Sequence, residues 1–311
     1  MNGLLNVSSN PHTRSKVTTS NLMFTVVVAL LPAAGFGIYH FGLNALLLMA
    51  VCVGSSVLFE LLFELITKRK ITVGDFSAVV TGLLLALNLP PGAPWWIAVV
   101  GSFFAIVVVK MLFGGLGQNF MNPALGARCF LVISFASIMT DFSVDGVSGA
   151  TPLALLKQGE PVDLVAMVKG TIPGTIGETS VIALLIGACI LVIFGVIDLW
   201  VPGVYIVTFL LCIGLFGGHG FDPYFLASHF AGGGLVLGAF FMATDYVTRP
   251  VTKSGQFVYG IILGVLTAVL RVFGPSAEGV SFAIIISNLL VPLIDKACAP
   301  RFFGKGGARI E

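Results

Sequence analysis

Long apolar runs separated by short polar breaks make up most of the chain. The runs lie at about 22–40, 43–66, 76–89, 95–113 and 122–139, and again at about 178–197, 203–217, 224–243, 256–273 and 279–295. About 20 apolar residues in a helix cross the hydrocarbon core of a bilayer. The pattern therefore predicts an all-α polytopic membrane protein with about ten transmembrane helices.

Polar stretches divide this pattern into five parts. We expect a polar head over 1–21, a first five-helix half over 22–139, a loop over 140–177, a second five-helix half over 178–295 and a basic tail over 296–311. The loop over 140–177 is the longest polar gap between apolar runs and has no apolar period of its own.

The two halves share a faint internal repeat. Phe113-Gly114 follows Lys110 as Phe273-Gly274 follows Arg271, at an offset of about 160 residues. The third run of each half holds a glycine at a matching place, Gly82 and Gly238, and ends in a loop marked by proline. An odd number of spans per half requires that the second half be inverted, a plan that resembles urea and ammonium channels. Paired interrupted helices in inverted halves indicate a binding site near the middle of the membrane.

Composition excludes a soluble domain. The chain is 57% hydrophobic and only 10% charged, whereas soluble domains carry about 25% charged residues. Its 5 cysteines are not spaced as Cys-x-x-Cys, and no Gly-x-Gly-x-x-Gly loop occurs. The sequence thus predicts no iron–sulfur, zinc or other metal site, no dinucleotide site and no nucleic-acid partner.

Lysine and arginine placement predicts the orientation. With both termini in the cytoplasm, 11 of the 16 Lys and Arg residues lie in inner loops and tails, and the outer loops hold only Lys157 and Lys169, with Arg271 near an outer helix end. Positive charges accumulate on the cytoplasmic side of membrane proteins. The loop over 140–177 is therefore expected outside the cytoplasm.

That loop carries the motif Asp145-Gly146-Val147-Ser148-Gly149-Ala150-Thr151. The pattern Asp-x-x-Ser-Gly-Ala-Thr resembles the acceptor signal of the flavin transferase that joins FMN, through its phosphate, to the final threonine. On this interpretation Thr151 supplies the hydroxyl, Asp145 and Ser148 serve recognition, and Gly149 and Ala150 leave room for the enzyme. Pro152 favours an extended Thr151.

Three segments together resemble one family over nearly the whole chain. They are Ser8-Ser9-Asn10-Pro11-His12, Gly117-Gln118-Asn119-Phe120-Met121-Asn122-Pro123, and the stretch from Asp145 to Leu153. The chain is similar to the D subunit of the Rnf complex, an ion-pumping ferredoxin:NAD oxidoreductase, and to the B subunit of the sodium-pumping NADH:quinone reductase. The absence of a longer N-terminal region favours the Rnf family, although Asn10 stands where the family often has a third serine.

The resemblance implies a second, non-covalent flavin, riboflavin, near the Gly-Gln-Asn-x-x-Asn-Pro segment. Asn119 and Asn122 are the candidate polar contacts, although both could instead cap the helix that begins at Pro123. Arg128, one turn further, could face a flavin or phosphate or extend to the inner surface. Glu60 and Glu64 are intramembrane carboxylates, and we expect Glu64 to pair with Lys68 at i,i+4.

The resemblance implies a protein that relays electrons through FMN and riboflavin and takes part in Na⁺ or H⁺ export, without a catalytic residue of its own. Its expected surroundings are a bacterial or archaeal plasma (inner) membrane, the lipid bilayer, the other Rnf subunits (A, B, C, E and G) and the flavin transferase. Two alternatives stay open: a flavin-free channel or transporter of the urea/ammonium type, and a structural scaffold. A flavin attachment signal favours the electron carrier over both.

Overall fold

The computed structural model describes residues 17–142, 151–158, 160–178, 180–274 and 279–300. Within these ranges every regular element is a helix, which confirms the all-α class. The elements in chain order are α1 (Thr19–Phe41), α2 (Leu43–Ile66), η1 (Val73–Asp75), α3 (Ser77–Leu87), α4 (Trp95–Phe103), η2 (Phe104–Met111), α5 (Pro123–Ser134), α6 (Ala136–Met139), α7 (Pro152–Lys157), α8 (Leu164–Lys169), α9 (Val181–Ile193), α10 (Trp200–Phe216), α11 (Pro223–Ala231), α12 (Leu235–Leu237), η3 (Gly238–Met242), α13 (Lys253–Phe273) and α14 (Val280–Ala297).

Four of these helices, α1, α2, α13 and α14, are long and apolar enough to cross a membrane. A fifth candidate consists of α11 followed by α12 and η3, but the pair is bent by 66° at its break. The remaining apolar runs hold shorter helices of 10–17 residues: Ser77–Leu87, Trp95–Met111, Pro123–Ser134, Val181–Ile193 and Trp200–Phe216. The fold is thus that of a polytopic membrane protein, and the count of ten spans stays a prediction.

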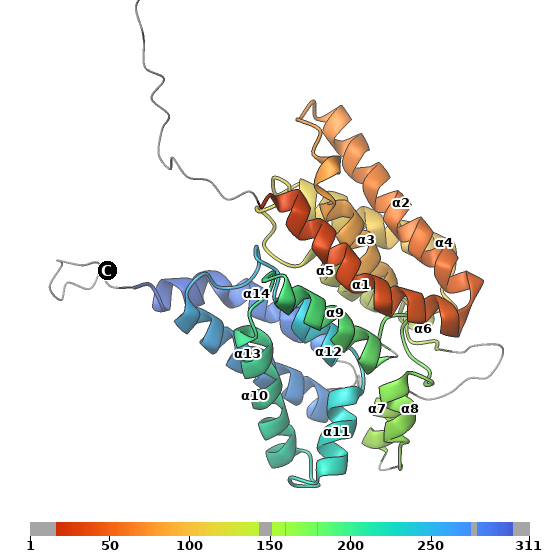
Figure 1. The fold of residues 1–311 in the computed structure, drawn as a ribbon, viewed down its shortest axis with the longest axis vertical. Helices are drawn as coiled ribbons and strands as arrows, with labels where there is room; N and C mark the ends of the chain where they lie inside the picture. The colour runs from red at the N-terminus through yellow and green to blue at the C-terminus, as the bar shows by residue number, and fades with distance from the viewer. Residues whose placement is uncertain (1–16, 143–150, 159, 179, 275–278, 301–311) are drawn as a thin grey trace, which may run out of the picture.

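Helices α1 (red) and α9 (green) pack against each other near the centre of the fold (Figure 1). Gly187 of α9 lies so close to α1 that a Cβ there would overlap the carbonyl oxygen of Ala29. Small residues at such crossings let helix backbones approach closely in a membrane. The crossing of α10 and α13 is built in the same way, because a Cβ on Gly264 would lie 2.6 Å from the Cβ of Thr208.

The segment before α9 joins the two halves through its backbone. The Ile176 amide donates to the Leu89 carbonyl at 3.0 Å, and the Gly177 amide donates to the Leu87 carbonyl at 2.8 Å. The end of α3 therefore has its free carbonyls satisfied by a chain segment from beyond the loop. Helices α5 and α14 form a further contact between the halves.

Two predicted stretches are more structured than the sequence indicated. The polar loop over 140–177 contains the short helices α7 and α8, whose amide groups are capped by the Thr151 and Asp163 side chains. The run over 122–139 breaks at Phe135, where the backbone leaves the helical region and α5 gives way to α6. Short capped helices escape detection by apolar period because they span fewer than two turns.

Candidate functional site

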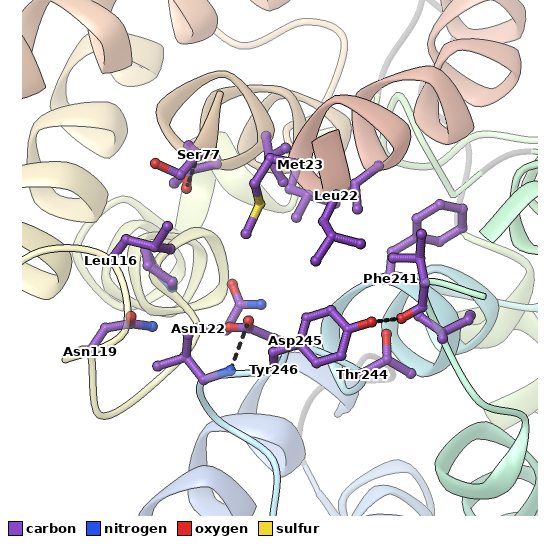
Figure 2. Close-up of a pocket in the computed structure, with 18 of the residues that line it drawn as sticks. Leu22, Met23, Ser77, Leu116, Asn119, Asn122, Phe241, Thr244, Asp245 and Tyr246 are labelled. Carbon is purple, nitrogen blue, oxygen red and sulfur yellow. Dashed lines mark hydrogen bonds between the residues drawn. The ribbon is translucent and has the colours of Figure 1, made fainter. Parts of the chain in front are cut away.

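A pocket of about 780 Å³, partly open to the outside, lies where segments from both halves meet. Figure 2 shows Leu22 and Met23 of α1 on one side, and Asn122 and Asp245 facing them from the other. Its lining residues come from α1, α3, η2, the turn before α5, the end of α9 and the chain around η3: Leu22, Met23, Val26, Ser77, Val80, Thr81, Leu84, Lys110, Leu116, Asn119, Asn122, Pro123, Leu191, Val196, Ile197, Phe241, Thr244, Asp245, Tyr246 and Val247. The fold therefore brings both predicted asparagines to a single cavity.

Asn122 has a structural task in addition to its place in the pocket. Its side-chain oxygen accepts from the amides of Ala124 at 3.1 Å and Leu125 at 3.4 Å, so it caps α5 with Pro123 in the first turn. The amide nitrogen of its side chain donates to the Met242 carbonyl at 3.4 Å. The capping interpretation is confirmed for Asn122 but not for Asn119, and Asn122 also links the start of α5 to η3.

Asn119 leaves more of its side chain available to a ligand. The amide nitrogen of its side chain donates to the Met121 carbonyl at 3.0 Å, which holds the side chain against the turn before α5. The residue is buried at 6% exposure yet lines the pocket. A buried amide at the edge of a cavity suits a planar ligand that carries both donors and acceptors on its rim.

A buried cation, Lys110, forms part of the pocket wall. The sequence alone did not indicate that this residue belongs to the site. Lys110 on η2 is 2% exposed, and its ammonium group donates to Glu60 at 2.8 Å and to the Ser77 hydroxyl at 2.6 Å. Glu64 accepts from the backbone amide and the hydroxyl of Thr72. The expected i,i+4 pair of Glu64 with Lys68 is therefore wrong, because the chain after α2 folds back and places Thr72 over this carboxylate.

Asp245 closes the opposite side of the pocket, in the turn that follows η3. Its carboxylate accepts from the Val247 amide and the Thr248 hydroxyl, each at 3.3 Å. Burial raises the pKa of the Asp245 carboxyl, while these two hydrogen bonds and the nearby Arg249 act in the opposite direction. The pocket thus presents a fixed ammonium group and a carboxyl group from two separate elements.

Arg128 lies behind the pocket and does not line it. Its guanidinium donates to the Asn88 side-chain oxygen and to the Glu178 carboxylate, both at 2.6 Å. Arg128 and Glu178 are 6% and 4% exposed. The prediction that Arg128 extends to the inner surface is wrong, because its guanidinium lies in a buried ion pair between α5 and the segment before α9. Contact of Arg128 with a bound group stays a prediction.

Thr151 is placed apart from the pocket, directly before α7. Its backbone is extended, as the following proline favours, and its hydroxyl oxygen accepts from the Ala154 amide at 3.4 Å. The side chain is half-buried. The other motif residues, Asp145, Ser148, Gly149 and Ala150, lie outside the described residues.

The structure defines a helical membrane protein with a pocket between its two halves and with Thr151 on a separate loop. The chain belongs to the NQR2, RnfD, RnfE family, whose model matches residues 6–304. The resemblance seen in its motifs is therefore confirmed.

Curated relatives resemble the chain over nearly its full length. It is 48% identical over 310 residues to the D subunit of the Na(+)-translocating ferredoxin:NAD(+) oxidoreductase complex of Acetobacterium woodii, covering 96% of this chain and 95% of the relative. It is 40% identical over 322 residues to the D subunit of the proton-translocating ferredoxin:NAD(+) oxidoreductase complex of Clostridium ljungdahlii, covering 97% and 96%. The D subunit of the ion-translocating oxidoreductase complex of Salmonella newport is 33% identical over 346 residues, covering 96% and 98%.

Proposed function

We propose that the chain is the D subunit of an ion-translocating ferredoxin:NAD oxidoreductase complex, the Rnf complex, and carries flavin within the membrane part of that complex. The observation that carries this assignment is the identity of 48%, over 96% of the chain, to the D subunit of such a complex. The ferredoxin and NAD sites then belong to other subunits. The relatives are named for Na⁺ in one case and for protons in another, so the transported ion is one of these two.

FMN is proposed to be attached to Thr151 through a phosphoester. The motif that ends at Thr151 supports this, together with the half-buried position of that residue directly before α7. A covalent tether holds the cofactor at its site without tight reversible binding, and flavin supplies the electron chemistry while the chain supplies position and electrostatics.

Riboflavin is proposed to occupy the pocket between the halves. Apolar side chains such as Leu22 and Phe241 offer surfaces to the faces of a planar ring, and Asn119 offers its amide to the rim. Lys110 and Asp245 place a positive group and an ionisable carboxyl on the lining. Because the Asn122 side-chain oxygen already caps α5, we assign Asn119 the direct contact and Asn122 the task of fixing the pocket wall.

The ten-span arrangement with two inverted halves is part of the same proposal. Contacts between elements support it, since α2 packs on α4 and η2 as α10 packs on α13, while α1 meets α9 and α5 meets α14 across the seam. Lys110 of η2 and Arg271 of α13 also correspond: one donates to Ser77 at the start of α3, the other to the Gly232 carbonyl at the break after α11. With the N-terminus in the cytoplasm and five spans in the first half, the loop that carries Thr151 would lie on the outer side.

In-gel flavin fluorescence tests the proposal directly. The complex is purified from a host that has the flavin transferase and is run on a denaturing gel, where only covalent flavin stays with this chain. We expect a fluorescent band for the natural sequence and none for Thr151→Ala. The flavin released by denaturation is identified by chromatography, and riboflavin is expected from both proteins. A Thr151→Ala band as bright as that of the natural chain would contradict the attachment site.

A further inference from the structure

A second cavity, of about 650 Å³, lies beside α7 and shares no lining residue with the pocket between the halves. Helix α7 contributes Leu153, Leu156 and Lys157 to its lining. The ends of α10, α11 and α13 close it from the other sides, and in Figure 1 α7 and α11 lie at the same end of the molecule. The cavity is therefore built by the loop that carries Thr151 together with the second half.

Arg271 gives this cavity a fixed positive charge. It is 3% exposed, and its guanidinium donates to the His229 carbonyl at 2.5 Å and to the Gly232 carbonyl at 2.9 Å, while lying 5.0 Å from the centre of the Phe209 ring. Lys157, whose ammonium group donates to the Gly274 carbonyl, brings a second positive charge to the lining. A cation held in an apolar surrounding attracts negative charge more strongly than one in water.

The remaining wall is a row of planar rings. The ring centres of His219 and Phe225 are 4.6 Å apart, and those of Phe225 and His229 are 4.5 Å apart. Nδ1 of His229 is buried and has no hydrogen-bond partner within the described part of the chain. Buried polar groups in folded proteins are nearly always paired, so this nitrogen indicates a ligand that would approach it.

The cavity is within reach of Thr151 through α7. Leu153, the second residue after Thr151, packs against the glycine break after α11, where a Cβ on Gly232 or Gly233 would collide with the leucine side chain. At a helical rise of 1.5 Å per residue, Leu156 lies about 8 Å along the axis from Thr151. The ribityl chain of a flavin spans such a separation.

We propose that this second cavity holds the isoalloxazine ring of the FMN on Thr151, with the pyrimidine edge of the ring, which carries its hydrogen-bond acceptors, toward Arg271 and Lys157. The inference rests on the proposed attachment of FMN to Thr151. Leucine and aromatic side chains cover the faces of the ring, and the two cations favour its reduced state, since each electron that the ring accepts adds negative charge.

Variants of the cavity test this in the intact complex. Leu156→Trp fills the cavity, Lys157→Gln removes one charge and Lys157→Arg retains it. Lys169→Gln is the control, because Lys169 is an exposed lysine at the end of α8 that does not line the cavity. The signal of the tethered flavin is the difference between each complex and the same complex carrying Thr151→Ala.

Three readouts separate docking from attachment. In-gel fluorescence is expected to be unchanged in all variants. Quenching of the tethered flavin by iodide is expected to rise severalfold in Leu156→Trp, because the ring is forced into solvent. Its midpoint potential, titrated with dithionite, is expected to fall in Lys157→Gln and to return in Lys157→Arg. If Leu156→Trp and Lys157→Gln give a fluorescent gel band but show the same quenching and midpoint potential as the Lys169→Gln control, the docking inference alone is overturned. If the natural chain gives no fluorescent band, the attachment of FMN to Thr151 is overturned as well.

Discussion

At the scale of single residues, the buried charges that matter most to the fold are those with partners far away in the sequence. Arg128 meets Asn88 and Glu178, which lie 40 and 50 residues from it. Removing one member of a buried ion pair leaves the other charge without compensation in a medium of low polarity, whereas replacing both by apolar residues is nearly neutral.

Glu178→Gln is therefore expected to lower the free energy of unfolding by about 3 kcal/mol or more. The double variant Arg128→Met with Glu178→Leu is expected to recover most of that loss. Thermal unfolding in detergent measures both, with the exposed Glu160→Gln as the control. Equal stability of Glu178→Gln and Glu160→Gln would show that the pair does not hold the segment before α9 in place.

At the scale of elements, close helix crossings determine where the halves meet. Membrane helices gain little from the hydrophobic effect on packing together, so contact depends on how closely their surfaces fit. Gly187 on α9 meets the Ala29 carbonyl of α1, and nothing lies within 4 Å of a Cβ built on Gly54 of α2. Both glycines lie within helices, but only Gly187 is packed against a neighbouring helix.

Gly187→Ala is expected to destabilise the protein by about 2 kcal/mol, because α1 and α9 must separate to admit the methyl group. Gly54→Ala is expected to be neutral or to stabilise by up to about 1 kcal/mol, since alanine is the better helix former. The midpoints of thermal unfolding of the two variants decide the point. A Gly187→Ala protein as stable as Gly54→Ala would mean that the crossing is looser than the structure has it.

At the scale of the whole molecule, the sequence predicts local features well and assembled ones poorly. Apolar runs locate the helices, and Asn122-Pro123 predicts both the start of α5 and its cap. The pocket combines Leu22, Lys110 and Asp245 from distant segments, and no periodicity connects such positions. The sequence around Lys110 and around Glu60 does not indicate which partner either charge has. Only the packing of η2 on α2 shows that the two side chains form an ion pair.

The proposed orientation places Thr151 on the outer side of the membrane, and reporter fusions can test this. With 11 of 16 Lys and Arg residues in inner loops and tails, a green fluorescent protein fused to the C-terminus is expected to fluoresce, because it folds in the cytoplasm. Alkaline phosphatase, which is active only outside the cytoplasm, is expected to be active when fused after Gln158 and inactive when fused after Lys70.

The fusion after Lys70 is the matched control, since it follows two proposed spans instead of five. An inactive fusion after Gln158 would place Thr151 in the cytoplasm, where a transferase acting on the outer face could not reach it. The proposed FMN attachment would then have to be abandoned, whereas riboflavin in the pocket between the halves would be unaffected. The proposed attachment of FMN to Thr151 thus depends on the orientation of the chain in the membrane.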